Sequence, residues 1–193
     1  MNYLRGFIPW IAYAVVSSAG WQWGALTGLL LACGLLLMDR AAGFSLDLRL
    51  LDYGTIVFFA ALAALALARP DSGLRDYGSA LSSGWLALIA WTSLAVRRPF
   101  TLAVARRMAP PEVWKTRVFL RINVVLTAAW ALSFTLTAAA QAVISAYGLG
   151  TVSSVLVQLA GFAVPIRFTA VYPERARARF LRQAGMRIET QGV

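Results

Sequence analysis

The chain has 193 residues, of which 60% are hydrophobic and 13% charged, with a net charge of +10 and a mean hydropathy of +0.68. A soluble domain is about one-quarter charged, so this composition indicates an integral membrane protein. The chain has no histidine and a single cysteine, Cys33, which excludes His-ligated haem, His-containing zinc sites, Ser-His-Asp catalysis and an intrachain disulfide. We therefore expect neither a metal site nor a cofactor.

The first apolar stretch predicts a helical hairpin. Residues 6–38 carry no charge and as one helix would be about 50 Å long, against a hydrocarbon core of roughly 30 Å. The segment from Gly20 to Gly24 offers a break, with Trp21 and Trp23 at the outer interface. This predicts spans at about 4–19 and 22–38. The alternative is one strongly tilted span, which would give five spans in all.

Four further apolar runs follow the hairpin. They lie at about 53–68, 80–96, 122–147 and 149–172. We expect the connection 39–51 to lie in the membrane interface, and we expect Pro173 to end the last span. The predicted fold class is an all-α polytopic bundle of about six transmembrane helices, with one membrane domain over residues 1–172 and a basic cytoplasmic tail over 173–193.

The basic residues indicate an orientation. With six spans, Arg5, Arg40, Arg49 and the two arginine-rich stretches 97–121 and 175–187 lie on one side, whereas the other side receives only Arg69 and Arg75 with nearby acids. Because Lys and Arg near span ends are retained in the cytoplasm, both termini are predicted to be cytoplasmic. Because the basic residues lie beside the membrane spans, we expect them to bind anionic lipid rather than nucleic acid.

The segment between the fourth and fifth spans mixes basic and apolar residues. This pattern is typical of an interfacial segment, in which apolar groups reach the acyl boundary and guanidinium groups bind lipid phosphate. It is either a loop that only fixes topology, a docking surface for anionic headgroups or a second membrane protein, or a substrate-binding loop. The candidate docking residues are Arg97, Arg98, Arg106, Arg107, Trp114, Arg117 and Arg121.

The same segment carries a resemblance. Arg-Pro-Phe-Thr at 98–101, a basic helix, Glu112 and Trp114 beside prolines, then Phe119, Arg121, Asn123 and Trp130 are similar to small bacterial membrane proteins of the intracellular septation protein A type. The entry Leu51-Asp52-Tyr53-Gly54-Thr55 to the third span is also similar in layout. The resemblance implies an inner-membrane protein linked to envelope maintenance or division, and it supplies no catalytic residues.

Polar residues inside the spans recur at helical spacing. Ser133, Thr137, Gln141 and Ser145 form one stripe, and Ser154, Gln158, Gly161 and Pro165 form another. The short link at 148–150 makes these helices antiparallel neighbours, so Gln141 and Gln158 are expected to face each other, either as ordinary interhelical hydrogen bonds or as the lining of a polar cavity. Arg167 either snorkels to the interface or pairs with Asp52 inside the bundle. These alternatives define a candidate intramembrane site of Arg167, Asp52, Gln141 and Gln158.

Three function classes remain from the sequence. The favoured one is an interaction or scaffold protein of the bacterial inner membrane, binding anionic lipid or another membrane protein, with a homo-oligomer left open. A transporter or channel for a small solute or lipid is the second. An enzyme acting on a lipid or isoprenoid is the third; its catalytic residues are unknown, and only acids near the surface are available for acid-base work.

Overall fold

The computed structural model describes residues 2–41 and 50–191, and this part of the chain is helical, without a strand. Its α-helices are α1 (Ile8–Val16), α2 (Trp21–Ala41), α3 (Leu50–Ala68), α4 (Gly78–Ala95), α5 (Thr101–Met108), α6 (Arg117–Tyr147) and α7 (Gly150–Gln191). Short 3-10 turns cover Asn2–Phe7, Ser17–Ala19, Gly73–Tyr77 and Pro111–Val113. The all-α fold is therefore confirmed. The expected interfacial connection 39–51 lies largely outside the described residues.

The predicted hairpin in the first apolar stretch is confirmed. Gly20 has a φ of 147°, a conformation that glycine adopts without a Cβ penalty, and it separates α1 from α2. A Cβ on Gly24 would meet Ser17, and a Cβ on Gly28 would meet the ring of Phe59 in α3. Glycines in α2 thus allow close packing inside the chain.

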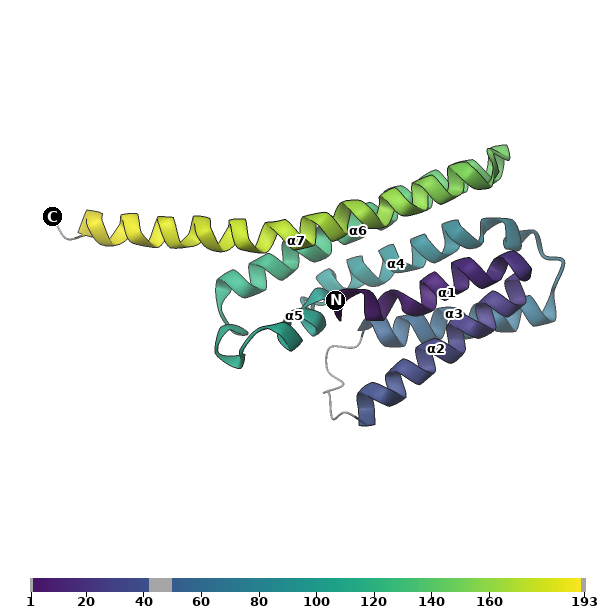
Figure 1. The fold of residues 1–193 in the computed structure, drawn as a ribbon, viewed down its shortest axis with the longest axis horizontal. Helices are drawn as coiled ribbons and strands as arrows, with labels where there is room; N and C mark the ends of the chain where they lie inside the picture. The colour runs from purple at the N-terminus through teal and green to yellow at the C-terminus, as the bar shows by residue number, and fades with distance from the viewer. Residues whose placement is uncertain (1, 42–49, 192–193) are drawn as a thin grey trace.

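The bundle has two distinct ends (Figure 1). At one end, called here the turn end, lie the Gly20 break, the loop 69–77 and the link at 148–149. At the other, called the basic end, lie Arg5, α5, and the point where α7 leaves the bundle. Four helical segments are long and apolar enough to cross a membrane: Trp21–Ala41, Leu51–Ala68, Arg117–Tyr147 and Gly150–Phe180. The count of six spans and the side of the termini stay predictions.

Two helices are longer than the hydropathy pattern indicates. The fifth predicted span begins at Arg117 rather than near 122, because the Thr116 hydroxyl caps the helix by accepting the backbone N–H of Phe119 at 3.3 Å. The sixth does not end as a helix at Pro173: α7 continues to Gln191. A proline removes one intrahelical hydrogen bond, but the residues that follow it include good helix formers such as Glu174 and Arg175.

The antiparallel α6–α7 pair is confirmed. Gly148 in the left-handed conformation ends α6, with its N–H bound to the carbonyl of Ile144. Pro165 has no N–H to offer the carbonyl of Gly161, and that carbonyl instead accepts the Ser133 hydroxyl at 2.7 Å. The polar stripe of α6 therefore pairs with that of α7 by interhelical hydrogen bonds.

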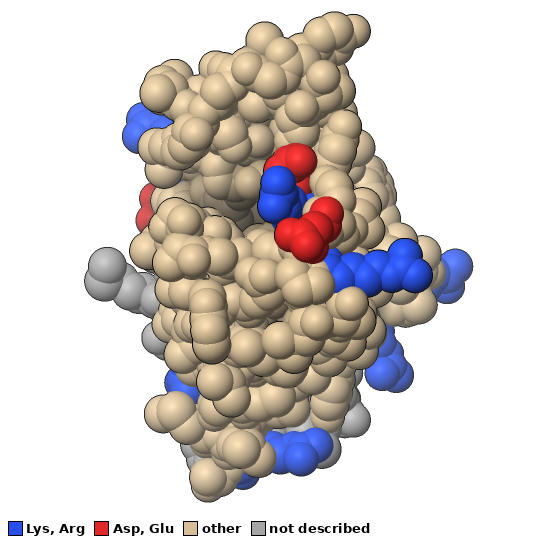
Figure 2. All heavy atoms as spheres, turned by 90° about the vertical axis from the view of Figure 1, so that its right-hand side faces the viewer, with Lys and Arg blue, Asp and Glu red and all other residues tan. Residues whose placement is uncertain are grey.

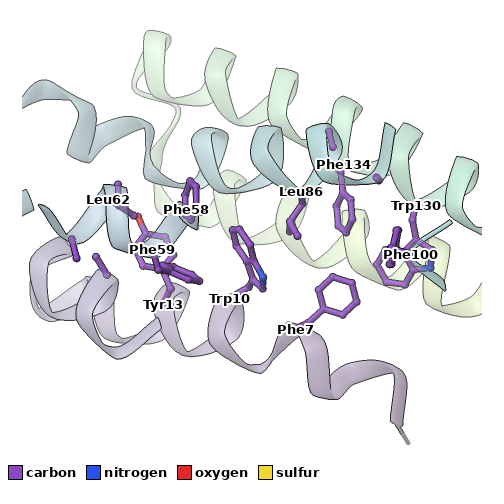
Figure 3. Packing of buried hydrophobic residues seen from close by; sticks show 14 of the residues in the cluster. Phe7, Trp10, Tyr13, Phe58, Phe59, Leu62, Leu86, Phe100, Trp130 and Phe134 are labelled. Carbon is purple, nitrogen blue, oxygen red and sulfur yellow. The ribbon is translucent and has the colours of Figure 1, made fainter. Parts of the chain in front are cut away.

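An aromatic cluster forms the core (Figure 3). The stack of Trp10 on Phe58 has a centroid distance of 5.0 Å and joins α1 to α3. At the start of α1, Phe7 stacks on Trp130 of α6 at 5.1 Å. Phe7 also meets Phe162 of α7 edge-on at 5.5 Å. The first helix therefore lies among the others and joins the two halves of the chain.

Candidate functional site

A groove of about 540 Å³ lies between α1, the start of α4 and the first half of α7, at the turn end. Its volume is within the range of roughly 300–1,000 Å³ that is usual for small-molecule sites. Figure 2 looks onto the turn end and shows a hollowed surface beside a small group of charged side chains. Residues that line it include Ile11, Tyr13, Val15, Ser17, Asp76, Ser82, Ser154, Gln158, Leu159, Phe162 and Ile166.

The groove is open along its side. Ile11 and Val15 of α1 are 50% and 67% exposed, and Leu159 of α7 is 62% exposed, although all three line the groove. Because these exposed side chains line the groove from both α1 and α7, the groove is open to the outside between the two helices. In a membrane, such a slot faces the acyl chains directly.

The deep end of the groove is apolar and closed by rings. Phe162 lines the groove and packs edge-on against Phe134 at 5.7 Å and Phe7 at 5.5 Å. Figure 3 shows Phe7, Trp130 and Phe134 gathered in this part of the core. These packed rings form the inner end of the groove.

A hydrogen-bonded polar group lies partway along the groove. Nε2 of Gln141 donates to the carbonyl of Ser154 at 2.8 Å and to Oε1 of Gln158 at 3.2 Å. The Ser154 hydroxyl donates to Oε1 of Gln141 at 2.7 Å. Gln141 is 1% exposed, whereas Gln158 and Ser154 are half-buried and line the groove. The predicted approach of the two glutamines is thus confirmed.

The rim of the groove carries one acid and one base. Nε of Arg75 lies 3.6 Å from Oδ1 of Asp76, and both side chains are more than half exposed. Such an exposed pair contributes little to stability. Because the two charges oppose each other, the rim offers no net charge to a ligand.

A second, much smaller cavity lies at the basic end. It has a volume of about 60 Å³, enough for a few water molecules but not for an organic ligand. Asp39 is buried there between Arg107, whose Nη2 is 2.7 Å from Oδ2, and Arg5, whose Nη2 is 3.2 Å from Oδ1. An acid in the last turn of α2 opposes the helix dipole, and the two arginines offset this. The triad joins the start of the chain to α2 and α5.

The predicted docking residues fall into two groups. Arg97, Arg98, Arg117 and Arg121 are exposed at the basic end. The others bind the protein itself: Arg107 pairs with Asp39, and the guanidinium of Arg106 lies 5.4 Å from the ring centroid of Trp114. Nε1 of Trp114 in turn donates to the carbonyl of Ala109 at 2.9 Å. Binding of anionic lipid by this segment stays a prediction.

The four residues of the predicted intramembrane site do not form one site. Gln141 and Gln158 belong to the groove, whereas Asp52 lines the small cavity at the basic end. Arg167 is exposed, and no carboxylate of the described residues lies within 4.0 Å of it. The pairing of Arg167 with Asp52 is therefore not formed, and the exposed position fits the snorkelling alternative.

Sequence reasoning missed the contribution of α1 to the groove. In the sequence, nothing distinguishes Ile11, Val15 and Ser17 from other residues of a membrane span. The residues around them do not indicate which helix they face. The signal was indirect: Ser154 and Gln158 lie four residues apart in the stretch 152–166, whose only other polar side chain is that of Ser153. Comparison of the chain with protein-family models, curated proteins and solved structures finds no match, so the septation-like resemblance also stays a prediction.

Proposed function

We propose that the protein binds one amphiphilic lipid molecule in the groove between α1 and α7 and is, in function, a lipid-binding or lipid-transporting membrane protein. The observation that carries this proposal is the shape of the groove, which opens both at the turn end and sideways toward the acyl chains. A lipid enters such a slot from the bilayer without leaving the membrane. A water-soluble solute gains nothing from an opening that faces the acyl chains.

The distribution of polarity along the groove supports an amphiphile. Arg75, Asp76 and Thr151 lie at the outer rim, Ser154 and Gln158 lie deeper, and Phe162 and Ile166 lie deepest. This order matches a headgroup, a polar linkage and a hydrocarbon chain. A small-solute channel is less well supported, because the ring cluster fills the space between the groove and the basic end.

The proposal is tested by narrowing the groove. Ala14 lines it and is exposed, so Ala14→Phe places a ring in the lipid path. Ala61 of α3 is also exposed but does not line the groove, so Ala61→Phe is the matched control. We expect native mass spectrometry of the full chain with diacyl phosphocholine to show a bound lipid that Ala14→Phe removes and Ala61→Phe retains. Equal retention by both variants, or no bound lipid in the unmodified protein, contradicts the proposal.

The orientation is part of the same proposal. We place the protein in a bacterial inner membrane with six spans, both termini in the cytoplasm and the turn end outside, on the basis of the arginine distribution. The test uses Ser72, which lies in the loop at the turn end. The variant Ser72→Cys in a Cys33→Ala background has this position as its only cysteine. A membrane-impermeant thiol reagent added outside intact cells is expected to label it. Labelling only by a permeant reagent reverses the orientation.

A second candidate is a scaffold that binds anionic lipid or another membrane protein in envelope maintenance or division. The exposed Arg97, Arg98, Arg117 and Arg121 at the basic end support it. Replacement of Arg97 and Arg98 by Gln is expected to weaken binding to anionic vesicles by about 1 kcal/mol per charge. Unchanged sedimentation with phosphatidylglycerol vesicles would remove this support. An enzymatic role is not favoured, because the charged cavity is too small for a substrate.

A further inference from the structure

We propose that the side-chain amide of Gln158 donates a hydrogen bond to a carbonyl of the bound lipid, so that the groove selects ester- or amide-linked lipids over lipids with ether linkages. The inference rests on the proposed lipid groove and names the class of lipid. It follows from three observations: the direction of the Gln158 amide, its depth in the groove and the charge of the rim.

Hydrogen-bond logic fixes the direction of the amide. The backbone carbonyl of Ser154 only accepts, so the Gln141 atom 2.8 Å from it is the donor Nε2. That Nε2 only donates, so the Gln158 atom 3.2 Å away is the acceptor Oε1. The Nε2 of Gln158 is consequently the other terminal atom of a side chain that lines the groove. Among the described residues no acceptor is within hydrogen-bond distance of it.

An unpartnered amide donor in an apolar environment is costly. Without a partner, its desolvation costs about 1–3 kcal/mol, and water that would satisfy it is scarce beside acyl chains. Two other hydroxyls that line the groove already donate within the protein: the Ser82 hydroxyl donates to the carbonyl of Gly78, and that of Ser17 to the carbonyl of Ala14. The Nε2 of Gln158 is therefore available to donate a hydrogen bond to a ligand in the groove.

The depth of Gln158 matches the linkage region of a lipid. At 1.5 Å per residue, Gln158 lies about 12 Å along α7 from Gly150 at the turn end. About the same distance separates Gln158 from Ile166 at the apolar end of the groove. A headgroup between Thr151 and Asp76 thus places the first carbonyl near Gln158 and the chain beside Phe162. An isoprenoid chain carries no acceptor at that depth.

The paired charges of the rim give no electrostatic selection of the headgroup. Arg75 has Asp76 as its immediate neighbour, so an isolated cation for a phosphomonoester or diphosphate is lacking in the described rim. Selection therefore comes from the linkage and from the fit of the chain. A zwitterionic or uncharged headgroup, with no net charge to neutralise, fits this rim.

A matched pair of lipids tests the inference. Diacyl and dialkyl phosphocholine of equal chain length differ only in the two carbonyls, and their binding to the full chain is compared by competition in native mass spectrometry. One hydrogen bond predicts about a three- to tenfold preference for the ester lipid. Gln158→Met, which keeps the length of the side chain and removes the donor, is expected to abolish this preference. Leu159→Ala, in the same wall, is expected to weaken both lipids equally and to retain the preference.

The outcomes separate the inference from the proposed function. Equal binding of the two lipids by the unmodified protein overturns the selection by Gln158 and leaves the groove as a lipid site. A preference that persists in Gln158→Met also overturns it. Binding of neither lipid overturns the proposed function and the inference with it. Because the preference is a ratio within each variant, a general loss of stability does not imitate the expected result.

Discussion

The helices α4 and α7 differ in composition and in burial: the more polar helix, α4, is buried, and the more apolar helix, α7, is exposed. In soluble proteins the apolar helix would be the buried one. α4 contains four serines in 18 residues and is not among the four segments that are long and apolar enough to cross a membrane. Three of its serines, Ser82, Ser83 and Ser93, are nevertheless buried. The Gly150–Phe180 part of α7 is long and apolar enough to cross a membrane, yet only 6% of its most apolar stretch is buried. Its exposed residues include Val152, Leu156, Leu159 and Val164.

In a membrane the apolar helix is the outer one. Lipid chains are as apolar as leucine, so helices associate through close packing of small residues and through hydrogen bonds. α4 follows this rule: Trp85 Nε1 donates to the carbonyl of Gly54 in α3 at 2.8 Å, and Trp91 Nε1 to the hydroxyl of Thr135 in α6 at 3.1 Å. In this bundle, high hydropathy of a helix therefore indicates contact with lipid. Small or polar residues indicate contact with other helices.

The largest expected effect comes from enlarging a buried residue of α4. Ala90 is 1% exposed in the core cluster, so Ala90→Leu is expected to lower the free energy of unfolding by about 1–3 kcal/mol through overpacking. Leu156→Ala in α7, where the side chain is 62% exposed, is expected to change it by no more than about 0.5 kcal/mol. Thermal unfolding in detergent measures both. Similar losses would remove the contrast between the two helices.

A smaller effect is expected where α7 does pack. A Cβ on Gly161 would meet the hydroxyl of Thr137 and approach its Cγ2 to 3.2 Å. Gly161→Ala is therefore expected to cost about 1 kcal/mol, at the low end of overpacking. Adding Thr137→Ala removes both atoms and is expected to restore part of the loss. Purely additive losses in this double-mutant cycle would place the clash elsewhere.

The smallest effect concerns the carbonyl that Pro165 leaves free. Ser133→Ala removes its donor and is expected to cost about 0.6 kcal/mol, the typical value of an interhelical hydrogen bond in a membrane. In a Pro165→Ala background the backbone N–H of residue 165 is available to this carbonyl, so the same substitution is expected to cost nothing. An equal cost in both backgrounds would show that Ser133 does not replace the missing backbone donor.

Local patterns predicted the features that depend on adjacent segments. The glycines at 20–24 predicted the first hairpin, and a three-residue link with two polar stripes predicted the meeting of Gln141 and Gln158. The helix starts and ends were less well predicted, because Thr116 caps α6 among charged residues, and helical residues continue α7 past Pro173.

Contacts between distant segments were not predictable from one sequence. Arg107 reads as a lipid-facing cation within its own segment, but its partner Asp39 lies 68 residues earlier. The groove has the same origin, because its two walls are α1 and α7, at opposite ends of the described chain. Spacing along one helix shows which residues share a face, and it does not show which other helix that face meets.

The buried serines of α4 have a consequence for biosynthesis. α4 is translated before α6, the helix on which it chiefly packs. During membrane insertion, α4 is therefore a weakly hydrophobic segment whose main partner does not yet exist. The Ser82 and Ser93 hydroxyls donate to carbonyls of α4 itself, those of Gly78 and Ala90, so these groups are satisfied before α6 arrives. Ser83, the third buried serine, has no hydrogen-bond partner among the described residues, so α4 alone satisfies two of its three buried serine hydroxyls during this interval.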